Sequence, residues 1–470
     1  MSILMSTRMA ELDAIENYDK VPEECYRIFL YHSLFNDHTR FDGVASGDGY
    51  LSVSNLQRDA YGYYSYHMDV EPKEHIIYFG EERIKYLKYI GRSFKMIRSF
   101  LAVGQGAFYC EQFKSSYYPN INIVYDCGSS TDVRLVESQI RNNFEKGEVI
   151  QAVFISHLDE DHINGLPFLM RYCKVENLFF PLITQSEIDY IVINNIIKAG
   201  EEHSFAALFV NNPYRAFDYY EISRRPHLYQ IQESIRNEDR YNNIDAISLL
   251  SGDDVGGRIF YNTDAKHPLK DKWLYIPYNF RQKDRITQLE NELKIQFNRN
   301  IGSKEALDIW RNGTDEKRQK IKKAYEAVKG SFNTNSMILY SGLADDNTRQ
   351  SYFNNSCYFC FYQKCHYKPA GCLYMGDYDA SGKYKWNELC KAYEKVWKYI
   401  GCVQIPHHGS KYNYNPEFAN MNAFFIMSAG RCNPYQHPHS IVIKDLLFCG
   451  HSPLIVTENK ASEVNLVINI

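Results

Sequence analysis

The pattern of hydrophobic and polar positions changes at about residue 96, where short apolar runs begin to alternate with glycine-rich or acidic turns. Residues 99–110 (SFLAVGQGAFYC) predict a strand, a turn and a second strand. Residues 121–130 (INIVYDCGSS) and 151–156 (QAVFIS) predict two more strands, and residues 163–172 (INGLPFLMRY) have helical spacing. These segments together indicate an α/β fold.

Between about residues 185 and 330 the spacing becomes that of amphipathic helices. Residues 281–297 and 304–330 each repeat apolar positions every three or four residues, and the second ends on Gly330, a residue type that favours helix termination. We expect a mostly helical insertion here. Strand patterns then return at five places, residues 333–342, 356–363, 371–377, 398–410 and 423–430.

Three regions follow from this pattern. Residues 1–95 carry no recognisable chemistry and form an N-terminal region of unknown role. Residues 96–470 form the α/β domain, which the helical insertion at about 185–330 interrupts. A chain of 470 residues is too long for one average domain, but it suits one elaborated α/β domain with these additions.

Composition narrows the class of protein. The hydrophobic fraction is 44% and the charged fraction 23%, as in folded proteins. The net charge of −4 does not favour a broad nucleic-acid-binding surface, so any contact with a polyanion must be local. No apolar run approaches the ~20 residues that cross a bilayer, and the N-terminus becomes acidic too early for a secretory signal. We expect a cytoplasmic protein with no membrane contact, whose 12 cysteines are reduced thiols.

Ligand-type side chains collect directly after the strand predicted at residues 151–156. Residues 155–166 (ISHLDEDHINGL) place His157, Asp159, Asp161 and His162 within six positions. Imidazole and carboxylate groups are ligands for zinc, manganese and iron, and four of them can serve two ions. A solvated acidic turn is the alternative interpretation of this stretch taken alone.

Three later groups also follow apolar runs. Asp377 follows LYMG, His407 and His408 follow QIP, and His437 and His439 lie in NPYQHPHS. Several strands that deliver ligands to one sheet edge would produce this order. The sequence therefore predicts a site for two divalent metal ions.

The set of motifs resembles the metallo-β-lactamase-fold hydrolases. More narrowly, it resembles the nuclease-like domain at the C-terminal end of bacterial competence DNA-uptake channel proteins. The matching stretches are VGQGAF, VYDCGSS, SHLDEDHINGL, NTNSMILY, LYMGDYD, IPHHGS and NPYQHPHS, which span residues 103–440 outside the insertion. The resemblance implies an αββα sandwich with a dinuclear site at one edge of the two sheets.

The resemblance also implies roles for individual residues. The implied metal ligands are His157, Asp159, Asp161, His162, Asp377 as the bridge between both ions, and His437. The implied supporting residues are Asp126, which would orient a ligand, with Ser410 and Asn335. The implied catalytic residues are Asp161 and the pair His407 and His408, and which of the two histidines borders the metal stays open.

Two departures from the family pattern matter. Asp159 stands where the common motif has histidine, and one more carboxylate makes the site harder, which shifts its preference from Zn²⁺ towards Mn²⁺. The family pattern also has a histidine in its third motif, and no convincing equivalent lies between His162 and Asp377. His203 is the candidate there, and a surface helix residue is the alternative interpretation.

The cysteine-rich stretch at residues 357–372 and Ser410 each allow a structural and a functional interpretation. Residues 357–372 (CYFCFYQKCHYKPAGC) faintly resemble a zinc knuckle, but a β-hairpin in which cysteines act as small hydrophobes is simpler. Ser410 beside His408 could act as a nucleophile, but no acid for a catalytic triad is evident. We favour a structural or phosphate-contacting role for Ser410.

The function expected from these observations is that of a metal-dependent hydrolase, a dinuclear phosphodiesterase or nuclease acting on a nucleic acid or nucleotide. The step from hydrolase to phosphodiester rests on the resemblance, and a role in defence against phage or mobile DNA would suit such an enzyme. One alternative is a hydrolase of a small ester, lactone or thioester. Another is a regulatory or binding module with a weak site, which recognises a protein partner through the N-terminal region or the insertion.

Overall fold

The structure is a computed structural model. It describes residues 95–114, 120–182, 185–199, 203–231, 273–279, 284–328, 336–343 and 368–469, with short strands at 259–260, at 350–353 and within 1–94. The chain divides into two compact units, residues 1–94 with 115–118, and residues 95–114 with 119–470.

The first unit contains two four-stranded sheets, with strand orders β1-β2-β6-β5 and β4-β3-β7-β8. Their strands are β1 (Ser2–Ile3), β2 (Tyr26–Tyr31), β3 (Phe41–Ser46), β4 (Gly49–Leu51), β5 (Gln57–Arg58), β6 (Tyr63–Met68), β7 (Ile76–Phe79) and β8 (Glu82–Lys85). The sequence patterns of this region did not predict these sheets.

The second unit is built on two large sheets. The first has nine strands in the order β16-β15-β13-β11-β10-β9-β26-β20-β21. They are β9 (Lys95–Phe100), β10 (Gly106–Lys114), β11 (Ile121–Ser129), β13 (Ala152–Phe154), β15 (Asn177–Pro181), β16 (His227–Ile231), β20 (Gln350–Phe353), β21 (Lys368–Pro369) and β26 (Val464–Asn469). β11, β13, β15 and β16 are parallel neighbours. β12 (Val149–Ile150) and β14 (Lys174–Val175) form a small separate pair.

The second sheet has seven strands in the order β17-β18-β19-β22-β23-β24-β25. They are β17 (Ile259–Phe260), β18 (Trp273–Asn279), β19 (Met337–Leu343), β22 (Gly371–Tyr374), β23 (Ile400–Gln404), β24 (Phe424–Ser428) and β25 (Leu454–Val456). β22 to β25 run parallel. The carboxyl ends of parallel neighbours lie at one edge of a sheet, so the loops after β22, β23 and β24 converge there.

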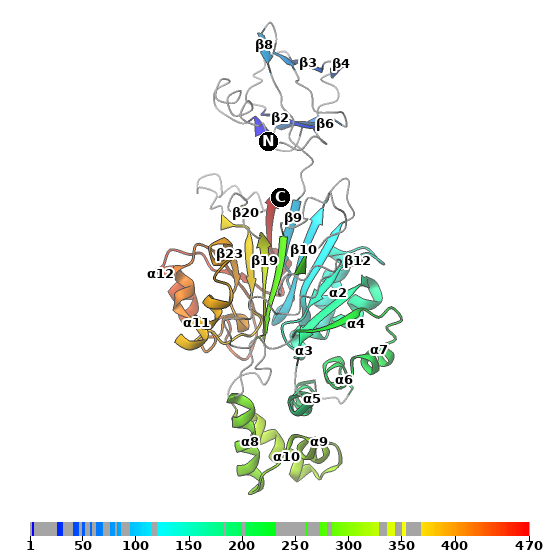
Figure 1. Ribbon diagram of the computed structural model, residues 1–470, viewed down its shortest axis with the longest axis vertical. Helices are drawn as coiled ribbons and strands as arrows, with labels where there is room; N and C mark the ends of the chain where they lie inside the picture. Colours follow the sequence, from blue (N-terminus) through cyan, green and yellow to red (C-terminus); the bar gives the residue numbers. More distant parts are fainter. Residues whose placement is uncertain are drawn as a thin grey trace. The chain divides into compact units, whose positions relative to one another are not determined.

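Helices cover the outer face of each sheet (Figure 1). α2 (Val133–Asn143) and α4 (Leu166–Tyr172) share an apolar core with the first sheet, and α11 (Lys383–Ala392) and α12 (Ser440–Phe448) share one with the second. The predicted α/β class is confirmed, and the layers are those of an αββα sandwich.

Short 3₁₀ turns connect several of these elements. They are η5 (Trp397–Tyr399), η6 (His407–Gly409), η7 (Pro416–Asn420) and η8 (Lys460–Ser462). η6 is of functional interest because it carries the predicted histidine pair.

A buried ion pair in the first sheet is the centre of a polar network that joins the two sheets. Arg98 in β9 donates to Glu111 in β10 at 2.8 Å, and both side chains are almost fully buried. From the second sheet, Tyr275, Ser341 and Tyr374 donate their hydroxyls to Glu111 at 2.7, 2.6 and 2.9 Å. Burial opposes the charge of Arg98, but the carboxylate of Glu111 keeps the pKa of Arg98 well above its usual value. Every charge in this interior network therefore has a partner.

The region expected as a helical insertion contains more than helices. Its helices are α5 (Gln185–Ala199), α6 (Phe205–Asn211), α7 (Pro213–Tyr219), α8 (Asp284–Phe297), α9 (Ser303–Asn312) and α10 (Asp315–Ala327). However, β16 joins the first sheet and β18 the second, so parts of this region belong to the sandwich itself.

The helical pattern over residues 304–330 is two helices rather than one. α9 ends at Asn312, and Gly313 has extended backbone angles. Thr314 then caps α10, and its side chain accepts a hydrogen bond from the backbone nitrogen of Lys317. The amphipathic periodicity continued across this break, so it did not reveal the turn.

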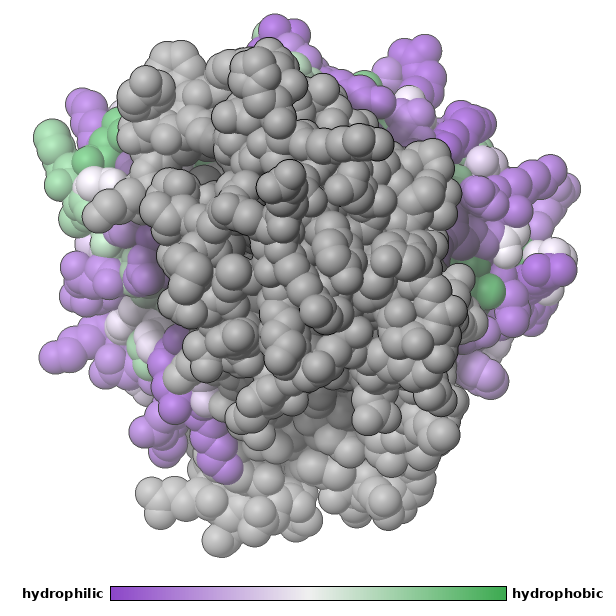
Figure 2. All heavy atoms as spheres, turned by 90° about the horizontal axis from the view of Figure 1, so that it is seen from above, coloured by the Kyte–Doolittle hydropathy of each residue, from purple (hydrophilic) through white to green (hydrophobic). Residues whose placement is uncertain are grey.

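Some sequence expectations lie outside the described residues. These are the strand expected at residues 356–363, the cysteine-rich segment up to His366, Asn335 and Gly330. Among the described residues, no helix combines the length and apolarity that a membrane crossing requires. Hydrophilic side chains dominate the described surface visible in Figure 2, with smaller hydrophobic groups between them.

Candidate metal centre

The loop after β13 carries the first cluster of ligand-type side chains. His157 and Asp159 lie between β13 and α3 (Glu160–Ile163), and Asp161 and His162 lie within α3. His157, Asp159 and His162 are each at most 1% exposed. Such burial contradicts the interpretation of this stretch as a solvated acidic turn.

Two glycines allow α3 to lie directly on the first sheet. A Cβ at Gly128 would lie 2.6 Å from the backbone carbon of Asp161 and 2.6 Å from the backbone nitrogen of His162. At Gly106, whose φ is +154°, a Cβ would lie 2.9 Å from the carbonyl oxygen of Asp161. A larger residue would push the helix away from the sheet. The glycines of VGQGAF and DCGSS therefore set the position of the ligands.

Asp126, within β11, supports the loop that carries the first ligand cluster. Its Oδ1 accepts a hydrogen bond from the backbone nitrogen of Ser156 at 2.7 Å. Its Oδ2 accepts from the Ser156 hydroxyl at 2.7 Å and from Nδ1 of His162 at 2.8 Å. Asp126 is fully buried. The residue that the resemblance assigns to orienting a ligand thus contacts one of the predicted ligands.

Three histidines have the same hydrogen-bonding pattern. Nδ1 of His162 donates to a carboxylate, and Nδ1 of His408 donates to the carbonyl oxygen of Ser428 at 2.8 Å. The Ser156 hydroxyl gives its own proton to Asp126, so it accepts from Nδ1 of His157 at 2.9 Å. In the neutral rings, Nε2 is then the atom with a lone pair. All three Nε2 atoms are buried without a hydrogen-bond partner, as expected of metal-binding imidazoles.

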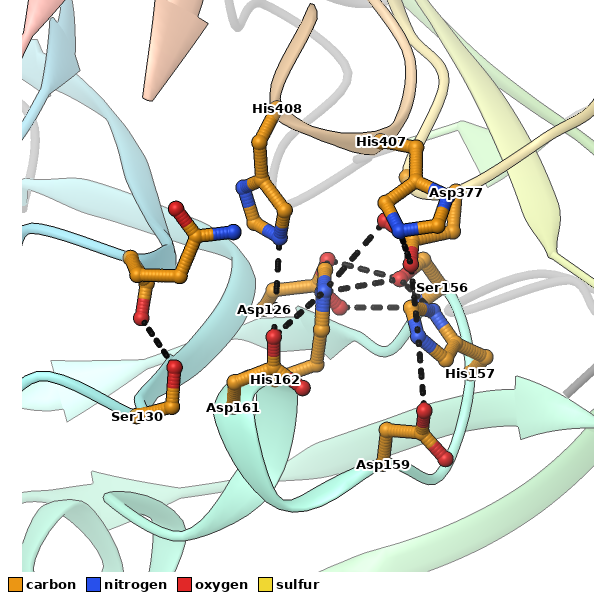
Figure 3. A network of polar contacts seen from close by, with 12 residues as sticks. Asp126, Ser130, Ser156, His157, Asp159, Asp161, His162, Asp377, His407 and His408 are labelled. Atoms are coloured by element: carbon orange, nitrogen blue, oxygen red, sulfur yellow. Dashed lines mark hydrogen bonds and ion pairs between the residues drawn. The ribbon is translucent and has the colours of Figure 1, made fainter. Parts of the chain in front are cut away.

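The second histidine pair is presented by a left-handed turn after β23. The φ angles are +48° at His407, +56° at His408 and +82° at Gly409. Left-handed non-glycine residues cost about 1–3 kcal/mol each, so the surrounding contacts must hold them. Asn413 accepts from Nδ1 of His407 at 3.1 Å, and a Cβ at Gly409 would lie 2.6 Å from Cβ of Pro438. The two imidazoles reach different parts of the cluster (Figure 3).

Asp377, directly after β22, lies between the histidines. Its Oδ1 is 3.5 Å from Nε2 of His162, and its Oδ2 is 3.6 Å from Nε2 of both His157 and His407. Burial opposes the charge of Asp377, but the histidines facing it, led by His407, hold its pKa well below the usual value. Asp377 is therefore ionised, with its two oxygens directed at different imidazoles.

Two overlapping sets of ligand atoms result from these placements. The ligand atoms of His157, His162 and Asp377 lie within 4.8 Å of one another, and so do those of Asp161, His162 and His408. Oδ2 of Asp161 is 3.5 Å from Nε2 of His408 (Figure 3). His162 thus lies between the two sets.

The remaining predicted ligand from the first cluster lies on the side of His157. Oδ2 of Asp159 is 3.9 Å from Nε2 of His157. The structure thus brings together five of the six predicted ligands with both members of the histidine pair.

The charge of the cluster fits two divalent cations. With neutral imidazoles, the carboxylates of Asp126, Asp159, Asp161 and Asp377 carry a formal charge of −4, which two divalent ions would balance. Burial opposes the charge of His162, but the three carboxylates of Asp126, Asp161 and Asp377 raise its pKa to about 10. This negative field attracts cations, and a bound metal ion would displace the proton on His162. The residues present therefore suit a pair of metal ions.

His437 is placed differently from the other predicted ligands. Its ring centroid lies 5.3 Å from that of His407 and 6.2 Å from that of His408. Among the described residues, the two compact sets of ligand atoms do not include it. Burial, followed by the neighbouring His407 and His408, lowers the pKa of His437 to about 3. His437 therefore borders the cluster as a neutral imidazole.

Two other candidates lie away from the ligand atoms. The Ser410 hydroxyl accepts a hydrogen bond from the backbone nitrogen of Tyr412 at 3.3 Å and so supports the turn after the histidine pair. His203 is exposed and its ring lies beside that of Tyr219, at 5.4 Å. The surface interpretation of His203 is therefore correct.

Sequence reasoning missed several residues that support the cluster. Ser156 links Asp126 to His157, and Oε1 of Gln404 accepts from the backbone nitrogens of Met375 and Gly376 at 2.7 and 2.8 Å, just before Asp377. A polar residue at the end of an apolar run, next to a ligand, is the signal that could have revealed Ser156 and Gln404.

The insertion also supplies support that was not predicted. In α5, Asn195 donates to the carbonyl oxygen of Leu158 at 2.9 Å, and Asn194 donates to Oδ1 of Asp159 at 3.4 Å. Both asparagines are buried. No pattern in a helix so far along the chain indicates which loop it will contact.

An α/β sandwich with buried histidines and carboxylates at one sheet edge defines a candidate metallohydrolase. The family model of the metallo-beta-lactamase superfamily matches residues 118–184, which include the first ligand cluster. Residues 118–184 are therefore similar to this superfamily.

Among whole proteins, the similarities found are to solved structures with low sequence identity. No curated protein matches the chain. Among solved structures, a long-form RNase Z from yeast is similar at 9% identity and a TM-score of 0.27, over 71% of this chain and 36% of that one. The chain thus spans about a third of the yeast protein. A hydrolase of the beta lactamase superfamily, AbOPH, is similar at 12% identity and a TM-score of 0.17, over 56% of this chain and 72% of that one.

Proposed function

We propose that the protein is a dinuclear metal-dependent phosphodiesterase that acts on a nucleic acid or a nucleotide. One observation carries the proposal. The buried, ionised carboxylate of Asp377 directs Oδ1 towards His162, and Oδ2 towards His157 and His407. A carboxylate that faces two imidazole sets with separate oxygens is placed to bridge two cations.

The residues divide naturally between the two ions. His157, Asp159 and His407 would hold one ion, and Asp161, His162 and His408 would hold the other, with Asp377 shared. Two divalent cations in such a site supply a water of lowered pKa and neutralise charge on a phosphoryl group. Manganese suits the carboxylate content better than zinc does.

In this proposal His407 and His408 would hold the metal ions and would not donate protons to the substrate. Nδ1 of His408 donates to Ser428, so its proton is engaged in the fold and Nε2 presents a lone pair. Asn413 holds Nδ1 of His407 in the same way. Both rings are thereby oriented towards the carboxylates.

The open side of the site is marked by two residues. The side chains of Asp161 and His407 are 19% and 20% exposed, whereas those of His157, His162, Asp377 and His408 are at most 5% exposed. Substrate would approach between Asp161 and His407. Oδ2 of Asp161 is then the carboxylate oxygen best placed to accept a proton from attacking water.

The choice of a phosphodiester substrate rests on the motif resemblance to the nuclease-like domain of DNA-uptake channel proteins, and two cations would neutralise such an anionic substrate. A cytoplasmic location and a role against phage or mobile DNA remain predictions of the sequence.

The test combines metal analysis with turnover. Purified protein should contain about two divalent ions per chain, and with Mn²⁺ it should hydrolyse at least one of a bis-phosphodiester reporter, single-stranded DNA and a cyclic dinucleotide. Asp377→Ala should reduce the metal content and lower turnover at least ~100-fold, the scale of a lost metal-stabilising role. His203→Ala removes an exposed histidine outside the cluster and, as the control, should retain both the metal content and the turnover.

The opposite pattern would overturn the proposal. If Ser410→Ala abolished turnover while Asp377→Ala kept it, the reaction would use a serine nucleophile and not a pair of metal ions. Hydrolysis of small esters or lactones without any phosphodiester turnover would instead favour the alternative substrate class.

A further inference from the structure

A stack of aromatic rings leads from the candidate metal centre to the surface. His408 is 4% exposed, and the ring of His437 lies over it with centroids 6.2 Å apart and planes 27° apart. Tyr435 continues the stack over His437, at 5.7 Å and 26°. Tyr435 is itself 65% exposed. The stack therefore begins at a histidine of the candidate metal centre and ends on a tyrosine in contact with solvent.

The loop that carries Tyr435 is held in place by its own hydrogen bonds. Asn433 accepts from the backbone nitrogen of His437 at 2.9 Å and donates to the carbonyl oxygens of His437 and Gly430 at 2.7 and 2.6 Å. The backbone nitrogen of His439 donates to Gly409 in the histidine turn at 3.0 Å. The position of Tyr435 relative to the cluster is thus set by the fold, which lowers the entropy cost of binding.

A second exposed tyrosine follows the histidine turn. Tyr412 is 72% exposed, and the ammonium group of Lys411 lies 5.0 Å from its ring centroid. The next residue, Asn413, donates to the carbonyl oxygen of Asp377 at 2.9 Å. Tyr412 is therefore attached to the same turn as His407 and His408, and Lys411 places a positive charge beside its ring.

We propose that Tyr435 and Tyr412 form a base-stacking platform that holds single-stranded nucleic acid at the candidate metal centre. This inference rests on the proposed phosphodiesterase function and names its substrate class. Proteins hold single strands by stacking bases on aromatic side chains and by placing positive charge near the backbone. Exposed tyrosines on the two loops that carry the histidines, with Lys411 beside one of them, supply both features.

The chemistry of the platform selects single strands over duplexes. Every nucleobase has a π face, so such stacking tolerates any sequence, but in a duplex those faces are covered by neighbouring base pairs. A strand whose bases stack on the platform would place its phosphates beside the two loops that carry the histidines. With a net charge of −4 on the chain, this local contact replaces a broad basic surface.

The first experiment measures binding by the full chain. A fluorescent single-stranded oligonucleotide with hydrolysis-resistant phosphorothioate linkages is titrated with protein, and anisotropy gives Kd. Tyr435→Leu and Tyr412→Leu should each raise Kd about 10-fold, within the range known for one lost base stack. Tyr435→Phe and Tyr412→Phe keep the ring and should restore binding.

The matched control is Tyr214→Leu. Tyr214 is 52% exposed and has the guanidinium of Arg225 5.8 Å from its ring, but it lies in α7. Its replacement should leave Kd unchanged. An equal loss in all three leucine variants would indicate general surface binding and overturn the platform.

A second arm replaces the nucleic acid. Wild-type protein should bind a base-free abasic strand and a duplex of the same length at least about 10-fold more weakly than the single strand. Equal affinity for the abasic strand would overturn the proposal, as would unchanged Kd in both Tyr435→Leu and Tyr412→Leu.

The outcome for the proposed function is separate. Tyrosine-dependent binding without turnover of any phosphodiester would reject the enzyme activity but keep the platform. Turnover of a phosphodiester, together with binding that does not depend on the tyrosines, would keep the enzyme activity but reject the platform.

Discussion

At the scale of single residues, the cluster depends on which atom each side chain presents. Nδ1 of His157, His162 and His408 is engaged by a protein acceptor, which leaves Nε2 to face the carboxylates. A histidine that donated from Nε2 instead could not bind metal in this position. The identity of the acceptors therefore matters as much as that of the ligands.

Asp159 gives a prediction about metal choice. With a carboxylate at this position, activity should be higher with Mn²⁺ than with Zn²⁺, because harder ligands favour the harder ion. Asp159→His should shift the preference towards Zn²⁺. The measurement is turnover of a phosphodiester reporter by chelated protein reloaded with each metal. If only Zn²⁺ restored wild-type activity, the argument from ligand hardness would be wrong.

At the scale of elements, α5 connects the helical region to the ligand loop. Its asparagines bind the backbone of Leu158 and the carboxylate of Asp159, and its Asp189 accepts from Ser303 in α9 at 2.8 Å. Tyr325 in α10 donates to the carbonyl oxygen of Tyr190 at 2.8 Å. The helices are thus joined by hydrogen bonds to the loop that presents the first ligands.

Asn195 provides the test of this connection. Asn195→Ala removes the buried donor to Leu158, and the affinity for the ion bound by His157 and Asp159 should fall about 10- to 100-fold, as for other residues behind metal ligands. Metal titration by calorimetry would measure it. Asn312→Ala, in the same helical region but exposed, is the control. Equal metal affinity in both variants would show that α5 plays no part in positioning the loop.

At the scale of the whole molecule, the two sheets must stay in register for their loops to converge. β13 brings ligands from the first sheet, and β22 and β23 bring them from the second. The Arg98–Glu111 pair, with the hydroxyls of Tyr275, Ser341 and Tyr374, ties the two sheets together in the interior. Such a network favours one alignment of the sheets because each polar group has a partner only there.

Removal of the charge of Arg98 should show how much this network contributes to the free energy of unfolding. Arg98→Ala leaves Glu111 buried with an unpaired charge, which costs about 3–5 kcal/mol of the free energy of unfolding. Urea denaturation would measure it. Arg299→Ala breaks an exposed ion pair with Glu305 and should change stability little. Similar small losses in both variants would contradict a structural role for the interior pair.

The sequence by itself determined the class of the fold and which types of side chain gather at the candidate site. Apolar runs that end in histidine or aspartate identify strand ends, and five of the six predicted ligands from these runs meet at one sheet edge with His407 and His408. Local periodicity carries this information because a buried strand needs apolar residues wherever it occurs. Glycines such as Gly128 belong to the same local signal.

Only the tertiary structure decided how the ligands are arranged. It separated His407 from His408, placed His437 beside the cluster and brought α5 onto the ligand loop. It also divided residues 304–330 into two helices and assigned β16 and β18 to the sheets. These outcomes depend on contacts between residues far apart in the chain, such as Asn195 with Leu158 and Arg98 with Ala370. Local patterns cannot encode such contacts, because the free energy of each depends on what the rest of the fold places opposite it.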